Sequence, residues 1–215
     1  MNGLSIDLLS VLGVVFVFIS SLVLLISSNW RWSISALAIQ YVGVFFLIVS
    51  EWRLPMAASM VLAGWISAMV LGTAISGLPQ DSNEIGDKPS WAFLSTETSQ
   101  KIPISATLFR LIAAGVVGLA VVSIVYKVVD WVPGIELEQS FGALTLIAFG
   151  LLHLGLTAQP FRVVLGLLTV LSGFEIFYAA VEVSALVAGL LAAVTLGLAL
   201  VGAYLIVAPA LENTS

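Results

Sequence analysis

The residue in this sequence with the clearest capacity for chemistry is a glutamate, Glu175, that stands alone in an apolar stretch. No basic residue lies within one helical turn of it, and Arg162, which opens the stretch, lies several turns away. An ionisable side chain inside a membrane span is costly and is for that reason a functional candidate. Because hydrocarbon favours the neutral carboxyl, such a group can alternate between neutral and charged states, as a proton relay requires. The alternative is a protonated glutamate that hydrogen-bonds to a neighbouring helix for packing.

Two further titratable residues are candidates for the same relay. Glu182 lies two helical turns after Glu175 and shares its face if the helix continues that far. If the helix breaks at 181–184, Glu182 instead lies at the membrane interface, close to water. His153 stands in the apolar segment 150–155, where an imidazole can relay protons or serve as a hydrogen-bonding tether between helices.

Other kinds of site have no support in the sequence. The chain has no cysteine and a single histidine, which excludes a disulfide framework and any multi-histidine metal or haem site built by this chain alone. The glycines are scattered through apolar segments rather than placed in a phosphate-binding loop. We therefore expect no catalytic residues, no metal ligands and no bound cofactor.

The composition requires that these candidates be positioned by membrane helices. Hydrophobic residues make up 60% of the 215 residues and charged residues only 9%, too few to cover a water-facing surface. Several apolar runs reach the length needed to cross a bilayer. These features exclude a soluble enzyme, a nucleic-acid-binding protein and a disordered chain.

The apolar runs predict a single all-α transmembrane domain over residues 1–215, a polytopic bundle of about seven helices. The last apolar run is too long for one span, so we divide it at 181–184. The polar segment 79–103 is predicted to be a cytoplasmic loop. The predicted spans cover residues 5–28, 32–51, 55–78, 104–128, 139–158, 162–181 and 185–208.

The basic residues predict an orientation in the inner (plasma) membrane. Five of them fall on one side of a seven-helix topology and two on the other, and the side with more basic residues is expected to be cytoplasmic. The N-terminus is then outside and the C-terminus inside. The N-terminal segment lacks a basic region and carries Asp7, which favours a mature span over a cleaved signal. The larger group is Arg31, Lys88, Lys101, Arg110 and Arg162, and the smaller is Arg53 and Lys127.

Small residues recur at every fourth position of the final span. Such a stripe allows close approach of another helix, which is either a helix of this chain or one from a different subunit. The residues of this small-residue stripe are Ala185, Gly189, Ala193 and Gly197.

The sixth span supports a resemblance to a known group. It is entered through Arg162, carries Gly173 and Glu175, and continues into the small pair Ala179 and Ala180. This pattern, with the seven-span layout and the polar loop after the third span, resembles the small membrane subunits of the complex I and membrane-bound hydrogenase superfamily. It is most similar to component E of hydrogenase-4-type complexes. The C-terminal half is similar to the small glutamate-bearing chain of complex I. Unlike those chains, this one has no asparagine after the glutamate.

The resemblance implies an accessory membrane subunit of a redox- or ion-driven complex that holds no redox cofactor itself. It implies that antiporter-like subunits pack against the chain, and that Glu175 contributes to a hydrated axis for proton or cation translocation. Two alternatives remain open: a purely structural or assembly subunit, and a small stand-alone carrier or channel. The expected partners are the lipid bilayer and other membrane subunits, and no nucleic acid.

Overall fold

In the computed structural model, residues 3–27, 29–77 and 104–212 are described, and within these ranges the chain forms seven helices and no strand. Each helix is long and apolar enough to cross a membrane, which confirms the predicted all-α membrane bundle. The predicted loop 79–103 lies outside the described residues. The helices are α1 (Gly3–Ile26), α2 (Trp30–Ile48), α3 (Leu54–Ser76), α5 (Ile104–Trp131), α6 (Leu137–Gly155), α7 (Pro160–Val181) and α8 (Ala185–Glu212).

Local sequence signals set several of the helix ends. The Asn29 side chain accepts a hydrogen bond from the backbone N–H of Arg31 at 3.0 Å and caps the start of α2. Proline stands in the first turn of α3 and of α7, where its missing N–H leaves no helical bond unmade. Gly134 adopts a positive φ of 90°, a conformation that glycine tolerates, and turns the chain between α5 and α6.

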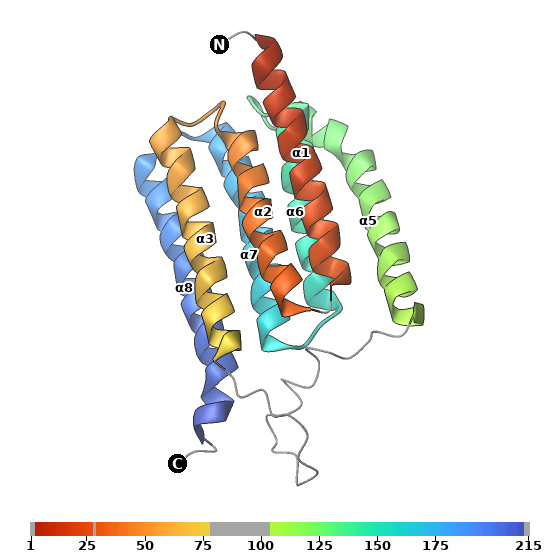
Figure 1. The fold of residues 1–215 in the computed structure, drawn as a ribbon. Coiled ribbons are helices and arrows are strands. Elements are labelled where there is room, and N and C mark those ends of the chain that lie inside the picture. The colour runs from red at the N-terminus through yellow and green to blue at the C-terminus, as the bar shows by residue number, and fades with distance from the viewer. Residues whose placement is uncertain (1–2, 28, 78–103, 213–215) are drawn as a thin grey trace.

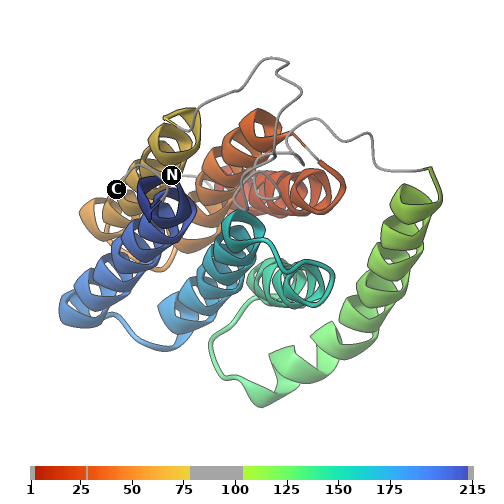
Figure 2. The same ribbon diagram turned by 90° about the horizontal axis from the view of Figure 1, so that it is seen from below.

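Six of the helices form two layers, with α5 at one side (Figures 1 and 2). One layer is α1–α2–α3 and the other α6–α7–α8. Across the layers α1 packs on α6, α2 on α7 and α3 on α8, while α5 rests mainly against α6. Successive helices alternate in direction, so the termini lie at opposite ends of the bundle (Figure 1).

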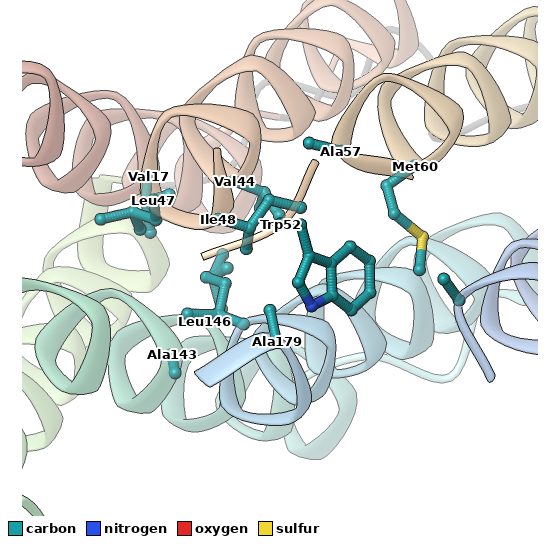
Figure 3. Close-up of a cluster of buried hydrophobic side chains, with 12 residues drawn as sticks. Val17, Val44, Leu47, Ile48, Trp52, Ala57, Met60, Ala143, Leu146 and Ala179 are labelled. Atoms are coloured by element: carbon teal, nitrogen blue, oxygen red, sulfur yellow. The ribbon is translucent and has the colours of Figure 1, made fainter. Parts of the chain in front are cut away.

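The space between the layers is filled by apolar side chains in two main clusters. One of them surrounds Trp52, in the turn between α2 and α3 (Figure 3). The Trp52 indole Nε1 donates a hydrogen bond to the Glu182 carbonyl oxygen at 3.2 Å, which ties this turn to the turn between α7 and α8. The other cluster lies toward the opposite end and includes Leu37, Tyr41 and Leu168.

Within the described part of the chain, most of the surface of the two outermost helices is uncovered. Only 17% of the apolar window of α5 and 22% of that of α8 is buried. The exposed residues are large and apolar, for example Leu119 on α5 and Leu186 on α8, as expected for helices that face lipid or other membrane proteins. The chain is therefore a multi-pass membrane protein.

The small-residue stripe lies on this uncovered surface of α8. Ala185, Gly189 and Ala193 are exposed, and a Cβ added at Gly189 or Gly197 would meet nothing within 4 Å. Among the described residues, no helix of this chain therefore packs closely against the stripe at these glycines. Packing against a different subunit stays a prediction.

A second face of α8 makes the contacts within the bundle instead. It carries Ala188, Thr195, Ala199 and Gly202, which are buried, and a Cβ at Gly202 would press on Val164 of α7. Both faces of α8 are built from small and apolar residues, so their composition does not distinguish the inner face from the outer one.

Candidate functional site

Glu175 of α7 is completely buried within the bundle. Its Oε1 atom accepts a hydrogen bond from the Thr195 hydroxyl of α8 at 3.0 Å, whereas its Oε2 atom has no hydrogen-bond partner. Among the described residues, no basic side chain pairs with the carboxyl. Because an isolated carboxylate is strongly disfavoured in such surroundings, the neutral acid is the resting form that this geometry favours.

Polar side chains from four helices gather around the carboxyl. The Tyr41 phenol of α2 lies beside Glu175, Ser172 and Thr195, and the Ser67 hydroxyl of α3 donates to the Thr195 carbonyl oxygen at 3.3 Å. These residues are all buried. We call this group the polar core cluster, and its members are Gln40, Tyr41, Ser67, Thr169, Ser172, Glu175 and Thr195.

One edge of α7 extends the cluster away from Glu175. The Gln40 amide Nε2 lies 3.4 Å from the Ser172 hydroxyl oxygen, to which it donates. The same side chain accepts from the Thr169 hydroxyl through Oε1, also at 3.4 Å. Thr169, Ser172 and Glu175 follow one another at intervals of three residues, which keeps them on neighbouring positions of one helix face.

A close contact between α2 and α3 holds the Tyr41 ring in place. The ring lies directly against the backbone of Gly64, where even a Cβ atom would collide with it. Tyr41 is completely buried. The absence of a side chain at Gly64 therefore makes room for the phenol that lies beside Glu175.

The Thr195 hydroxyl can serve either protonation state of Glu175. Its single proton has two acceptors at 3.0 Å, the Glu175 Oε1 atom and the Leu191 carbonyl oxygen of its own helix. When Glu175 is ionised, Thr195 donates to the carboxylate. When Glu175 is neutral, the carboxyl donates to the Thr195 oxygen and Thr195 donates to Leu191. Rotation of one hydroxyl thus accommodates the gain or loss of a proton.

The structure separates Glu182 from Glu175. Helix α7 ends at Val181, and Glu182 follows in an extended conformation with φ −142° and ψ 138°. Its side chain is exposed. The alternative in which both carboxyls line one helical stripe is therefore wrong, and the predicted break at 181–184 is confirmed.

His153 lies with basic residues rather than with Glu175. It stands in the last turn of α6 and is 7% exposed. It shares a shallow recess with Arg110 of α5 and Arg162 of α7. Glu175 is further along α7 than Arg162 by roughly 20 Å, from the helical rise of 1.5 Å per residue. The three predicted relay residues therefore do not form one continuous chain.

Sequence reasoning missed Thr195 and Thr169. Both hydroxyls bond to a carbonyl of their own helix, at 3.0 Å and 2.8 Å, as threonines in membrane helices commonly do. Nothing in the sequence distinguishes them from the other threonines of the spans. Gln40, Tyr41 and Ser67, three other polar residues of the cluster, are also buried.

The described residues contain no group of three or more histidine, cysteine, aspartate or glutamate side chains placed to hold a metal ion. Comparison of the chain with protein-family models, curated proteins and solved structures finds no match. The superfamily resemblance therefore rests on the residues of the sixth span and on the helix layout.

Proposed function

We propose that this chain is an accessory membrane subunit of a multi-subunit, redox- or ion-driven complex, in which Glu175 exchanges protons during translocation. The observation that carries the proposal is the setting of Glu175: a fully buried carboxyl without a basic partner among the described residues, next to hydroxyl groups from two other helices. A carboxyl in such a setting can bind and release a proton with little movement of its surroundings.

The shape of the bundle favours a subunit over an independent carrier. The carboxyl lies in a packed cluster, and the described residues leave the outer faces of α5 and α8 uncovered. The small-residue stripe of α8 is suited to close approach of a helix from another subunit. Under this proposal, antiporter-like subunits cover these faces and continue the proton path from Glu175.

The orientation in the inner (plasma) membrane belongs to the same proposal. Arg31, Arg110 and Arg162 stand at the end of the bundle where α2, α5 and α7 begin, and Arg53 and Lys127 stand at the opposite end. The excess of basic residues favours the first end as the cytoplasmic one, which leaves the N-terminus outside.

One observation favours a purely structural subunit as the second candidate. The hydrogen bond between Thr195 and Glu175 joins α8 to α7, and a neutral glutamate in that position ties two helices together without any transfer of protons. The two candidates differ in what happens when the carboxyl is replaced by an amide of the same shape.

The test is Glu175→Gln in the intact complex, purified through a tag on this chain and reconstituted into vesicles. We expect the variant complex to assemble with the same subunits and to lose proton translocation, because the amide cannot ionise. Glu175→Asp should retain part of the activity. Glu182→Gln is the matched control, since it removes an exposed carboxylate and should leave translocation unchanged. Translocation by Glu175→Gln at the parental rate would refute the relay and support the structural subunit.

A further inference from the structure

Glu175 lies much closer to one end of the bundle than to the other. Val181, where α7 ends, comes six residues after it, whereas Pro160, where α7 begins, comes fifteen residues before it. With a rise of 1.5 Å per residue, these separations along the helix are about 9 Å and about 22 Å. The shorter route from water to the carboxyl therefore starts at the end of α7, and the side chains that fill this route decide whether water reaches Glu175 from there.

The indole of Trp52 lies across this shorter route. Trp52 is 3% exposed and belongs to the apolar cluster that also holds Met60 of α3 and Ala179 of α7 (Figure 3). Ala179 follows Glu175 by one helical turn, and Ile176, the next residue after Glu175, is a member of the same cluster. The cluster around Trp52 therefore begins directly beyond the carboxyl and fills the space toward the end of α7.

Two contacts hold the indole in this position. Its Nε1 atom donates to the Glu182 carbonyl oxygen at 3.2 Å, and the Tyr178 ring packs against it edge-on, with the ring centroids 6.2 Å apart. Trp52 itself belongs to the turn between α2 and α3 and not to a helix. Gln139 of α6 fixes this turn by donating to the Glu51 side chain at 3.2 Å. The indole can therefore move away with its turn, without the unwinding of a membrane helix.

The polar residues of α7 near Glu175 lie on the other side of the carboxyl. Ser172 and Thr169 precede Glu175 by one and by nearly two helical turns, and both hydrogen-bond to the Gln40 side chain. The residues that follow Glu175 on the same face, Ile176 and Ala179, are apolar. Buried water requires polar partners, so the side toward the end of α7 is the drier side of the carboxyl.

We propose that Trp52 is a seal that keeps water out of the polar core cluster at the end of the bundle where α7 ends. With the indole in place, Glu175 exchanges no proton with water at that end, and displacement of the turn 49–53 opens the route. The seal itself is a property of the packing and requires no proton translocation. Its consequence, that protons reach Glu175 from one side at a time, rests on the proposed function.

The experiment measures access to the cluster by cysteine labelling, because the chain has no cysteine of its own. Ser172→Cys places a thiol in the buried cluster and leaves Glu175 intact. The measured quantity is the rate at which aminoethyl methanethiosulfonate, a small charged reagent, modifies this thiol in the full-length chain in detergent. We expect labelling much slower than at the exposed position of Glu182→Cys. Adding Trp52→Ala should raise the rate by at least about tenfold, which corresponds to about 1.4 kcal/mol less free energy for opening.

Two further variants separate a local seal from general loosening of the bundle. Leu168→Ala removes a fully buried side chain on the other side of Glu175, and it should raise the labelling rate by less than about twofold. Trp52→Leu leaves only part of the indole volume empty, so it carries the test if Trp52→Ala does not fold, with an expected rise of about threefold.

Three results would overturn the seal. They are labelling of Ser172→Cys as fast as that of Glu182→Cys, an unchanged rate in the folded Trp52 variants, and an equal rise in Leu168→Ala. The labelling rate does not depend on translocation. Parental translocation by Glu175→Gln would therefore refute the relay and leave the seal intact, and the reverse also holds.

Discussion

The contact between Gly64 and Tyr41 permits a quantitative test of how the polar core cluster is held together. In the substitution Gly64→Ala, the new methyl group collides with the Tyr41 ring. The ring is completely buried, beside Ser172, Thr195 and Glu175, so it has no empty space into which it can move. Forcing one extra methyl group into a well-packed core costs ~1–3 kcal/mol, and here the displaced ring also disturbs the neighbours of Glu175.

A matched substitution separates this collision from the intrinsic effect of alanine. Gly115→Ala places the same methyl group in the middle of α5, where nothing lies within 4 Å. Alanine in a helix interior is favoured over glycine by up to ~1 kcal/mol, so this control should be neutral or slightly stabilising. Gly64 and Gly115 both lie inside helices, so the propensity gain cancels, and the difference between the two variants is expected to be the overpacking cost of ~1–3 kcal/mol.

The assay is thermal unfolding of the purified chain in detergent, followed by circular dichroism and by loss of the monodisperse peak in size-exclusion chromatography. Gly64→Ala should melt several degrees below the parent, and Gly115→Ala at or above it. Gly64→Ala should lower the melting temperature less in a Tyr41→Leu background than in the parent, because the ring that collides is gone. Equal melting temperatures for Gly64→Ala and Gly115→Ala would refute the close contact.

Three further outcomes are expected. Thr195→Val removes the hydroxyl that donates to Glu175 and should lower the stability of the chain by ~1–3 kcal/mol in the same melting assay. Thr195→Ser keeps a hydroxyl and should be about as stable as the parent. Equal stability of the two variants would contradict the hydrogen bond. Gly189→Leu adds a side chain into open space, so the isolated chain should melt unchanged while the complex loses subunits on blue native gels; an intact complex would mean that the small-residue stripe faces lipid. The chain has no cysteine, so single cysteines at the exposed positions Ser50 and Ala158 report the orientation. A membrane-impermeant maleimide should label Ser50→Cys from outside the cell and Ala158→Cys only after lysis. The reverse labelling pattern would show that the predicted topology is inverted.

Much of the fold was predictable from the sequence because membrane insertion depends on local composition. The lengths of the apolar runs and the scarcity of charge gave seven spans whose ends differ from the structure by only a few residues. The break before the last helix was predictable for the same reason, since one helix could not contain the whole apolar run. A lone carboxyl in a span is also a local feature, so Glu175 was identifiable as a candidate without knowledge of its neighbours.

The partners of these residues were decided only by the tertiary structure. In a lipid-facing bundle both the inner and the outer faces of a helix are apolar, so periodicity does not indicate which face turns inward. For this reason the small-residue stripe of α8 was identified, while the face that carries Thr195 was not. His153 was grouped with Glu175 by chemistry, yet the packing of α6 against α5 and α7 places it beside Arg110 and Arg162. The spacing of residues along one helix cannot show which side chains of other helices surround a given residue, because these neighbours depend on how the helices pack.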